Sequence, residues 1–282
     1  MKTKLMQCLA ALALLLSANA AQAAISCSIS SPGFIAGYTS GGAQVITQSS
    51  FSISCTRGLV TDPLTTTYSV TVNNGLNPAG GGKNQAASGA NRLAYDTYTD
   101  SGCATQWKGA TTIPSPAGTI TMSGLTPTTV THNFWGCIAA GLTPVAGTYT
   151  DTVTMTPTYS AGVTGGTNTF PVTIITPATC TIASIPNITL AYGNAFSSTA
   201  VTATTSAPLT CTNAVPYTLA VSPTSGVSAG INYSLSLPAS GTGTGLSQGI
   251  TITATAPANQ AGTCGTGTCT GVAQLHTLTV TY

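Results

Sequence analysis

The chain has 282 residues, of which only 4% are charged, and its formal net charge is +2. So few cations cannot neutralise a phosphate backbone, which argues against a nucleic-acid partner. A low net charge also removes the electrostatic repulsion that keeps proteins apart in solution. Residues 177–282 contain no charged side chain, so the composition suits a permanent assembly better than a free monomer.

The first residues have the pattern of a secretory signal peptide. Lys2 and Lys4 form a basic start, residues 5–16 are an apolar run too short to span a bilayer, and residues 21–23 (AQA) form a small-x-small cleavage site. We therefore expect residues 1–23 to be removed and the mature chain to be exported. No later stretch is long and apolar enough to predict a transmembrane helix.

Eight cysteines remain in the mature chain, and an even number in an exported protein indicates disulfides. Their order in the chain suggests the pairs Cys27–Cys55, Cys103–Cys137, Cys180–Cys211 and Cys264–Cys269. A zinc site is poorly supported, because close C-x2-C pairs are absent and the chain has only two histidines. We predict no metal and no cofactor.

Two stretches of the chain, residues 27–55 and 180–211, repeat one design. Each has a short opening strand, an aromatic residue beside a glycine, and a Ser/Thr-rich strand that ends in cysteine. Short runs of Thr, Val, Ile and Tyr, separated by Gly, Ser, Pro and Asn, predict strands joined by turns. We predict an all-β chain of two immunoglobulin-like β-sandwich domains in tandem, residues 24–176 and 177–282.

Residues 169–175 (TFPVTII) follow a glycine-rich loop and alternate between apolar and other positions, which predicts a strand. Its apolar face consists of Phe170, Val172 and Ile174. We expect this donor-like strand to lie beside the strand that ends at Tyr159 and to complete the first sandwich. Pro171 removes one ladder N–H group, so it must face away from a partner strand.

The second copy closes on residues 276–282 (HTLTVTY), with Leu278, Val280 and Tyr282 on one face. No segment like 169–175 follows, so we expect the second sandwich to lack its last strand and to expose a hydrophobic groove and an unpaired edge. A strand from another polypeptide would fill it by β-augmentation. Only residues 24–26 precede the first mature cysteine, so we expect a chain that accepts a strand without donating one, at one end of a linear polymer.

Four stretches resemble a known family: residues 93–100 (LAYDTYTD), 134–136 (FWG), 147–159 (GTYTDTVTMTPTY) and 169–182 (TFPVTIITPATCTI). They are similar to the spore coat protein U domain, which builds archaic chaperone–usher pili of Gram-negative bacteria. The resemblance covers nearly the whole mature chain and is stronger in the first copy. The second copy has TGVAQL where the first has its GTYTDT lead-in.

The resemblance implies a tip adhesin that passes through the periplasm to the cell surface and sits at a pilus tip. It implies three protein partners: a pilin subunit that donates a strand, a periplasmic chaperone that holds the open groove, and an outer-membrane usher. It also implies adhesion to abiotic or host surfaces, as in biofilm formation.

Three loops of the first sandwich are expected at the end away from the second: residues 56–66, 99–129 and 160–168. They contain apolar residues where polar ones are usual, and exposed apolar surface marks interaction sites. The candidate surface-binding residues are Leu59, Val60, Leu64, Trp107, Ile113, Pro114 and Val163. The competing interpretation is that these side chains fold back onto the sandwich, which applies most strongly to Trp107, since tryptophan often anchors a loop to a core.

An enzyme is not indicated. Residues 245–249 match G-x-S-x-G, but a strand-like run follows instead of a helix, and that half of the chain has no acid to orient a histidine. We predict no catalytic residue. Two other interpretations stay open: a structural spore-coat-like or pilus-initiating subunit without adhesion, and a glycan-binding tip lectin that uses Trp107.

Overall fold

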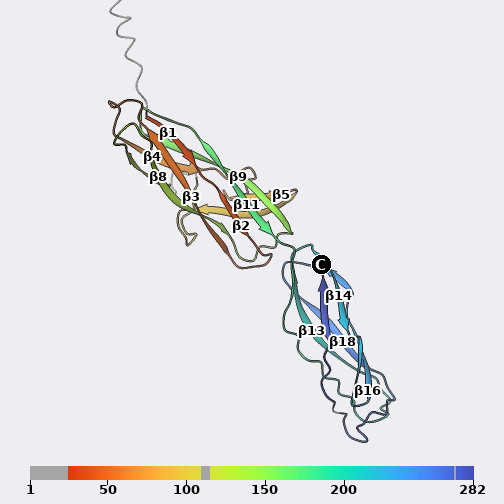
Figure 1. Ribbon diagram of the computed structural model, residues 1–282. Helices are drawn as coiled ribbons and strands as arrows, with labels where there is room; N and C mark the ends of the chain where they lie inside the picture. The colour runs from red at the N-terminus through yellow and green to blue at the C-terminus, as the bar shows by residue number, and fades with distance from the viewer. Residues whose placement is uncertain (1–24, 109–114, 270) are drawn as a thin grey trace, which may run out of the picture.

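The structure, a computed structural model, describes residues 25–108, 115–269 and 271–282. Every helix or strand in these ranges is a β-strand, which confirms the prediction of an all-β chain. The strands form two elongated units placed end to end, a first unit at residues 25–176 and a second unit at residues 180–282 (Figure 1). Nothing helical in the described ranges is long and apolar enough to cross a membrane.

The first unit contains eleven strands. They are β1 (Ile25–Ser30), β2 (Phe34–Gly37), β3 (Val45–Thr56), β4 (Thr65–Val72), β5 (Asn84–Ser88), β6 (Asn91–Tyr98), β7 (Ala117–Thr121), β8 (Thr128–Ile138), β9 (Gly147–Tyr159), β10 (Val163–Gly165) and β11 (Asn168–Thr176). One layer has the order β10-β1-β3-β8-β6, and the other contains β5, β9, β11, β2, β4 and β7. Strand β6 pairs with both β8 and β5, so it joins the two layers.

Strand β11 closes the second layer of this unit. It runs antiparallel to β9 over its whole length and pairs in parallel with β2 on its other side. The pairing with β2 begins at Val172, one residue after Pro171, so the proline, which lacks an N–H group, has a partner on β9 alone. Phe170, Val172 and Ile174 point into the core and are 0% exposed.

Aromatic side chains fill the centre of the first unit. Trp107 stacks on Phe51 with ring centroids 4.9 Å apart and also lies against Phe134 and Phe170. These residues come from both layers and from the segment after β6, so one cluster ties the sandwich together. Aromatic pairs of this kind add to the stabilisation that comes from burial alone.

The second unit contains eight strands. They are β12 (Cys180–Ile182), β13 (Val201–Cys211), β14 (Pro216–Ser222), β15 (Ser225–Ser228), β16 (Ile231–Ser236), β17 (Ser240–Thr242), β18 (Ser247–Ala256) and β19 (Thr277–Thr281). One sheet has the order β12-β13-β18-β16-β15 and the other the order β17-β14-β19. Residues 183–200, which follow the first strand as β2 does in the first unit, contain no strand.

Four disulfides staple the structure: Cys27–Cys55, Cys103–Cys137, Cys180–Cys211 and Cys264–Cys269. The first and third join the opening strand of each unit to the next long strand, at directly opposed ladder positions. On the chain-entropy model, closing a loop of this length contributes about 3–4 kcal/mol.

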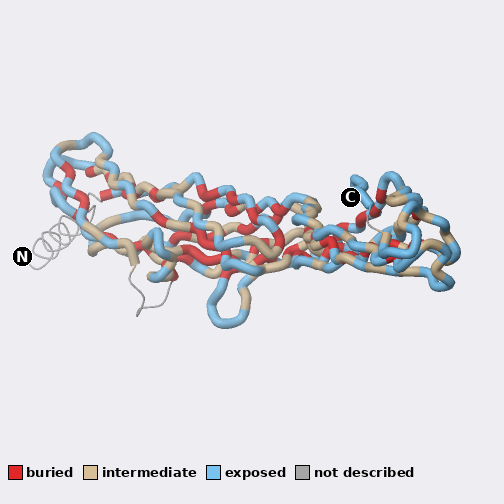
Figure 2. Tube along the Cα trace, turned by 90° about the horizontal axis from the view of Figure 1, so that it is seen from below, coloured by how far each residue is buried: buried red, intermediate tan, exposed pale blue. Residues whose placement is uncertain are grey.

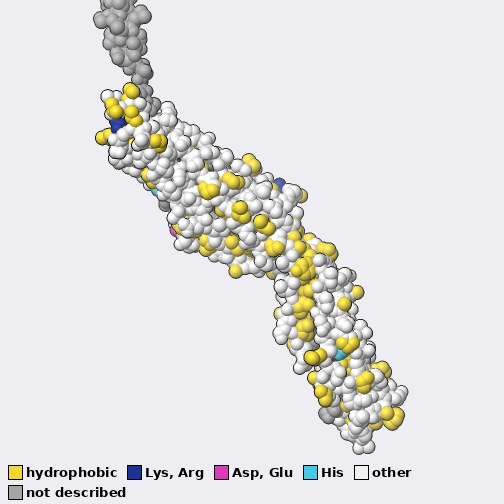
Figure 3. Space-filling view, viewed as in Figure 1, with side chains coloured by type: hydrophobic (Ala, Val, Ile, Leu, Met, Phe, Trp, Pro, Cys, Tyr) yellow, Lys and Arg dark blue, Asp and Glu magenta, His cyan; other side chains and the backbone are white. Residues whose placement is uncertain are grey.

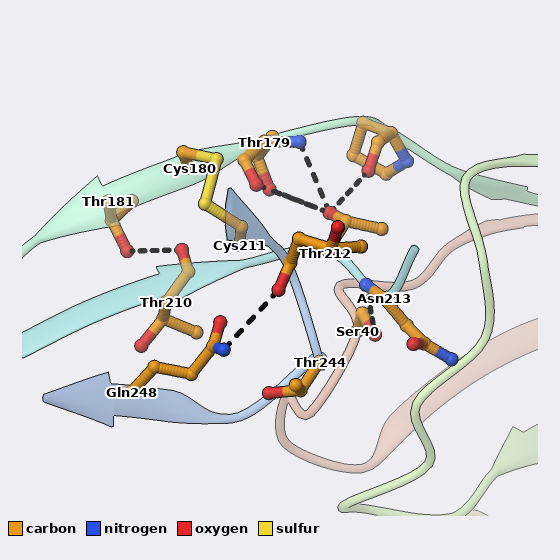
Figure 4. Close-up of a disulfide and its surroundings, with 12 residues drawn as sticks. Ser40, Thr179, Cys180, Thr181, Thr210, Cys211, Thr212, Asn213, Thr244 and Gln248 are labelled. Carbon is orange, nitrogen blue, oxygen red and sulfur yellow. Dashed lines mark hydrogen bonds between the residues drawn. A yellow bond between two sulfur atoms is a disulfide. The ribbon is translucent and has the colours of Figure 1, made fainter. Parts of the chain in front are cut away.

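Direct hydrogen bonds connect the two units beside the third disulfide (Figure 4). Asn213 donates from Nδ2 to the carbonyl oxygen of Thr143 at 2.8 Å and from its backbone N–H to Oγ of Ser40 at 3.5 Å. Thr212 Oγ1 donates to the carbonyl oxygen of Pro177 at 2.9 Å, which ties the connecting segment to the second unit. The junction is therefore held by polar contacts from both sides.

Candidate functional site

The second unit has an open sheet edge. Strand β19 pairs with β14 on one side, and no strand of the described residues pairs with its other side. Its inward residues Leu278 and Val280 are only half-buried, and Tyr282 is exposed. On β9, the corresponding strand of the first unit, Val153 and Met155 are fully buried because β11 covers them.

A groove lies beside this edge, with a volume of about 540 Å³. One wall is residues 185–192, which form no strand, and the other is residues 271–278. Apolar side chains from β16 and β18 form its floor, among them Ile231 and Ile252. Figure 3 shows a stripe of hydrophobic side chains on the second unit, running from the junction along its length. The groove can therefore accept an apolar extended segment.

The groove is also electrically neutral. Residues 177–282 have no Asp, Glu, Lys or Arg, so polarity at the rim comes from neutral groups. His276 lies 2.7 Å from the carbonyl oxygen of Pro223 through Nδ1, which must donate there. Nε2 of a neutral ring then accepts from the hydroxyl of Tyr233 at 2.8 Å. An uncharged apolar strand would meet no unpaired charge at this site.

The far end of the first unit, away from the second unit, consists of loops 57–64, 122–127 and 160–162. Ladder registers place these loops together: Thr65 pairs with Thr121, and Tyr68 pairs with Tyr159. Leu59, Val60 and Leu64 are 54%, 73% and 56% exposed. Leu125 is also exposed there, a residue that the sequence analysis missed.

Two buried charged side chains explain why the apolar residues of loop 57–64 face outward. Asp62 accepts the backbone N–H of Leu59 through Oδ2 at 2.7 Å, and Arg57 donates to the carbonyl oxygen of Val60. Both side chains are buried, and their hydrogen bonds to the loop backbone hold it in a conformation in which Leu59 and Val60 are exposed.

The assignment of Trp107 to a surface-binding loop is wrong. Its side chain is fully buried in the aromatic cluster, and Nε1 donates to the carbonyl oxygen of Val70 at 2.8 Å. Burying a large ring whose one polar atom finds a partner is favourable, which explains the placement. Val163 is half-buried on β10 beside β1, and Ile113 and Pro114 lie outside the described residues.

Among the described residues, the buried charged side chains all lie in the first unit. Asp151 on β9 accepts from the Tyr95 hydroxyl at 2.7 Å and from the backbone N–H of Leu76 at 2.8 Å. Asp100 accepts three backbone N–H groups of the turn that follows it, which lowers the pKa of its carboxyl. In the described ranges, no group of three or more His, Cys, Asp or Glu side chains is arranged to hold a metal ion.

Comparison with protein families gives a match over most of the chain. The model of the Spore Coat Protein U domain matches residues 12–156 and again residues 166–242. The chain belongs to the Spore Coat Protein U domain family. The first matched range ends within β9, and the second runs from just before β11 to the end of β17.

Several solved structures are similar to this Spore Coat Protein U domain protein at low identity. A chain of the CsuC–CsuE chaperone–tip adhesion subunit complex from archaic Csu pili of Acinetobacter baumannii is 13% identical, with a TM-score of 0.45 over 91% of this chain and 100% of that one. The CupB6 tip adhesin of Pseudomonas aeruginosa is 12% identical, with a TM-score of 0.43 over 92% and 96%. The adhesive subunit CfaE of enterotoxigenic Escherichia coli is 16% identical, with a TM-score of 0.28 over 53% and 48%. No curated protein matches the chain.

Proposed function

We propose that this protein is a pilus tip subunit that adheres to surfaces through the apolar loops at the far end of its first unit. A donor strand from a pilin subunit, inserted beside β19, anchors it to the pilus. The observation that carries the proposal is the open edge of β19 beside a neutral apolar groove, in a chain whose first unit fills the equivalent position with β11.

Filling the groove with a donor strand would contribute a large favourable free energy. Three or four apolar side chains of a donor strand, buried as those of β11 are, would contribute about 5–10 kcal/mol before entropy costs. Leu278 and Val280 would lose their remaining exposure at the same time. The same apolar edge would need protection before assembly, which is the role that the family resemblance gives to a periplasmic chaperone, with an outer-membrane usher as the assembly site.

The strand directions support a distal position for the first unit. β11 runs from the far end towards the junction, antiparallel to β9, and the second unit follows it. β19 ends at the junction, where Thr281 pairs with Thr218. A donor strand in the same antiparallel sense starts at the junction and leaves at the opposite end of the second unit. The donating subunit then lies beyond the second unit, and the far end points outward.

The adhesive end is tested by replacing Leu59, Val60 and Leu64 together with Ser. We expect adhesion to a hydrophobic abiotic surface to fall by about tenfold or more, since a tenfold loss corresponds to about 1.4 kcal/mol, which is less than the free energy that burial of three apolar side chains contributes. The matched control is Leu76→Ser, which removes a leucine that is 71% exposed and lies outside the far end. Unchanged adhesion of the triple variant, with normal secretion, would remove loop 57–64 from the adhesive surface.

Position on the cell is tested by immunogold electron microscopy with an antibody to the first unit. Label at the distal ends of thin filaments is the expected result. Label along the filaments, or evenly over the cell, would contradict the tip position and favour a structural or coat-like subunit.

The lectin interpretation has lost its main residue, because the buried Trp107 cannot stack on a sugar.

A further inference from the structure

Three buried polar side chains of the first unit meet at one point that adhesion and assembly do not use. Asn84 is the first residue of β5, and Asp96 lies on β6. Lys108 directly follows Trp107 in the segment after β6. They are 0%, 3% and 5% exposed. An amine, a primary amide and a carboxyl group are thus shielded together from water.

The contacts between these groups are direct. Lys108 Nζ lies 2.8 Å from Asp96 Oδ1 and also donates to Asn84 Oδ1. Asn84 Nδ2 donates to the Tyr95 hydroxyl at 3.3 Å, and that hydroxyl donates to Asp151 at 2.7 Å. The amide of Asn84 is therefore fixed with its carbonyl group towards the lysine amine and its NH2 group towards Tyr95.

We propose that Lys108 and Asn84 form an intramolecular isopeptide bond, in which Lys108 Nζ attacks Asn84 Cγ and ammonia leaves, with Asp96 as the general acid and base. The bond joins residues 24 positions apart and ties β5 to the segment after β6. It needs no cofactor, oxidant or second substrate.

The atoms and protons of this step balance. Asp96 takes one proton from the ammonium group of Lys108, and the free amine then forms the N–C bond to Asn84 Cγ. The nitrogen loses a second proton as the tetrahedral intermediate collapses, and the NH2 group of Asn84 leaves as ammonia after receiving one proton. Asp96 keeps the other proton or passes it to solvent. No electrons are transferred.

The surroundings favour the reaction in three ways. Burial lowers the pKa of Lys108, although the hydrogen bond to Asp96 acts in the opposite direction, so the nucleophilic free amine is easier to reach than on the surface. The fixed geometry replaces an encounter between free groups. A cavity of about 110 Å³ is lined by Tyr95 and Asp96 and gives the released ammonia a place beside the site.

The competing account is a plain buried ion pair between Lys108 and Asp96. Such a pair would satisfy both charges, and breaking either half would destabilise the unit, so loss of stability alone does not separate the two accounts. The mass of the protein does, because only the covalent bond removes an ammonia molecule.

The experiment is high-resolution mass spectrometry of the full mature chain, isolated from the periplasm, denatured and fully reduced. We expect a mass about 17 Da below that calculated from the sequence, the mass of ammonia. The full calculated mass would overturn the proposal, and so would a loss of about 18 Da, which would indicate water loss and an amide to Asp96.

Trypsin locates the bond, because cleavage after Lys83 and after Arg92 releases residues 84–92. We expect a branched peptide in which residues 84–92 are attached to Lys108, with cleavage after Lys108 blocked. Release of residues 84–92 as a linear peptide would overturn the proposal even with a loss of about 17 Da, since a succinimide elsewhere has that mass.

Two variants test the roles of Lys108 as nucleophile and Asp96 as base in the proposed bond formation. Lys108→Arg and Asp96→Asn should restore the full mass, the first by removing the nucleophile while keeping the charge, the second by removing the base. The matched control is Lys83→Arg, which changes the exposed lysine 3.4 Å from Asp96 Oδ2 and should keep the mass loss. Since the wild-type mass alone can overturn the proposal, a variant that fails to fold does not weaken the test.

Discussion

The two units of this protein share an opening disulfide, a Thr-rich closing strand and a two-layered arrangement, yet they differ in how one sheet ends. In the first unit β11 lies between β9 and β2, and its apolar face is completely buried. In the second unit β19 stops at an edge, and residues 183–200 form no strand beside it. Figure 2 shows the result, with buried residues concentrated in the first unit.

The difference extends to the core residues themselves. Leu219 and Val221 on β14 each remain 8% exposed, whereas Val70 on β4 is 0% exposed. These side chains are buried but less completely than their counterpart, as expected where the neighbouring ladder position has no strand. Closure of the sandwich, more than the strand pattern, therefore distinguishes the two units.

The largest expected effect comes from truncating a buried side chain on β11, the strand that closes the first unit. Phe170→Ala should lower the free energy of unfolding of that unit by about 3–5 kcal/mol, because it leaves a cavity in the aromatic cluster. Urea unfolding followed by tryptophan fluorescence measures it selectively, since Trp107 and Trp135 both lie in the first unit.

The matched variant for that experiment is Leu278→Ala on β19. Its side chain is half-buried at an open edge, so the tryptophan-reported transition should not move. Equal effects of the two substitutions on that transition would mean that the units unfold as one body and that β11 does not set the contrast.

A smaller effect is expected from filling the groove. A peptide copying residues 168–176 should stabilise the second unit by about 2.7 kcal/mol at a concentration of one hundred times its dissociation constant. Near-ultraviolet circular dichroism, to which tyrosines of both units contribute, measures the shift as a movement of the transition that tryptophan fluorescence does not report, and the tryptophan signal should stay constant. A peptide with Ser at the three apolar positions is the control, and stabilisation by both peptides would contradict recognition by an apolar face.

The smallest effect is a pH dependence specific to the first unit. Burial lowers the pKa of His132, whose ring stacks on Phe51 at 5.2 Å. The imidazole of His132 therefore binds a proton more readily in the unfolded chain than in the folded one. The contribution of the neutral His132 to the free energy of unfolding is complete above the ordinary pKa of about 6.5. It decreases as the pH drops from there towards the lower pKa of the folded state. Urea midpoints from pH 7.5 to pH 5 should decrease in the wild type and change less in His132→Gln. An identical decrease in both would assign the effect to other groups.

Much of the fold could be predicted from the alternation of single residues. Phe170, Val172 and Ile174 alternate in the sequence and all point into the core, because side chains on a strand alternate between faces whatever the strand's neighbours are. The same reasoning failed for Trp107. It lies in an irregular segment where no period indicates a direction, and the space between the two layers decided its position.

The sequence by itself determined the all-β character of the chain and a cysteine order that agrees with the four disulfides, since these depend on local spacing and composition. Only the tertiary structure decided which edge is closed, and which apolar loop residues face outward. It also brought Asn84, Asp96 and Lys108 together from three segments. The physical reason is that ladder pairing and burial join residues far apart in the chain, and a local pattern does not specify its partner.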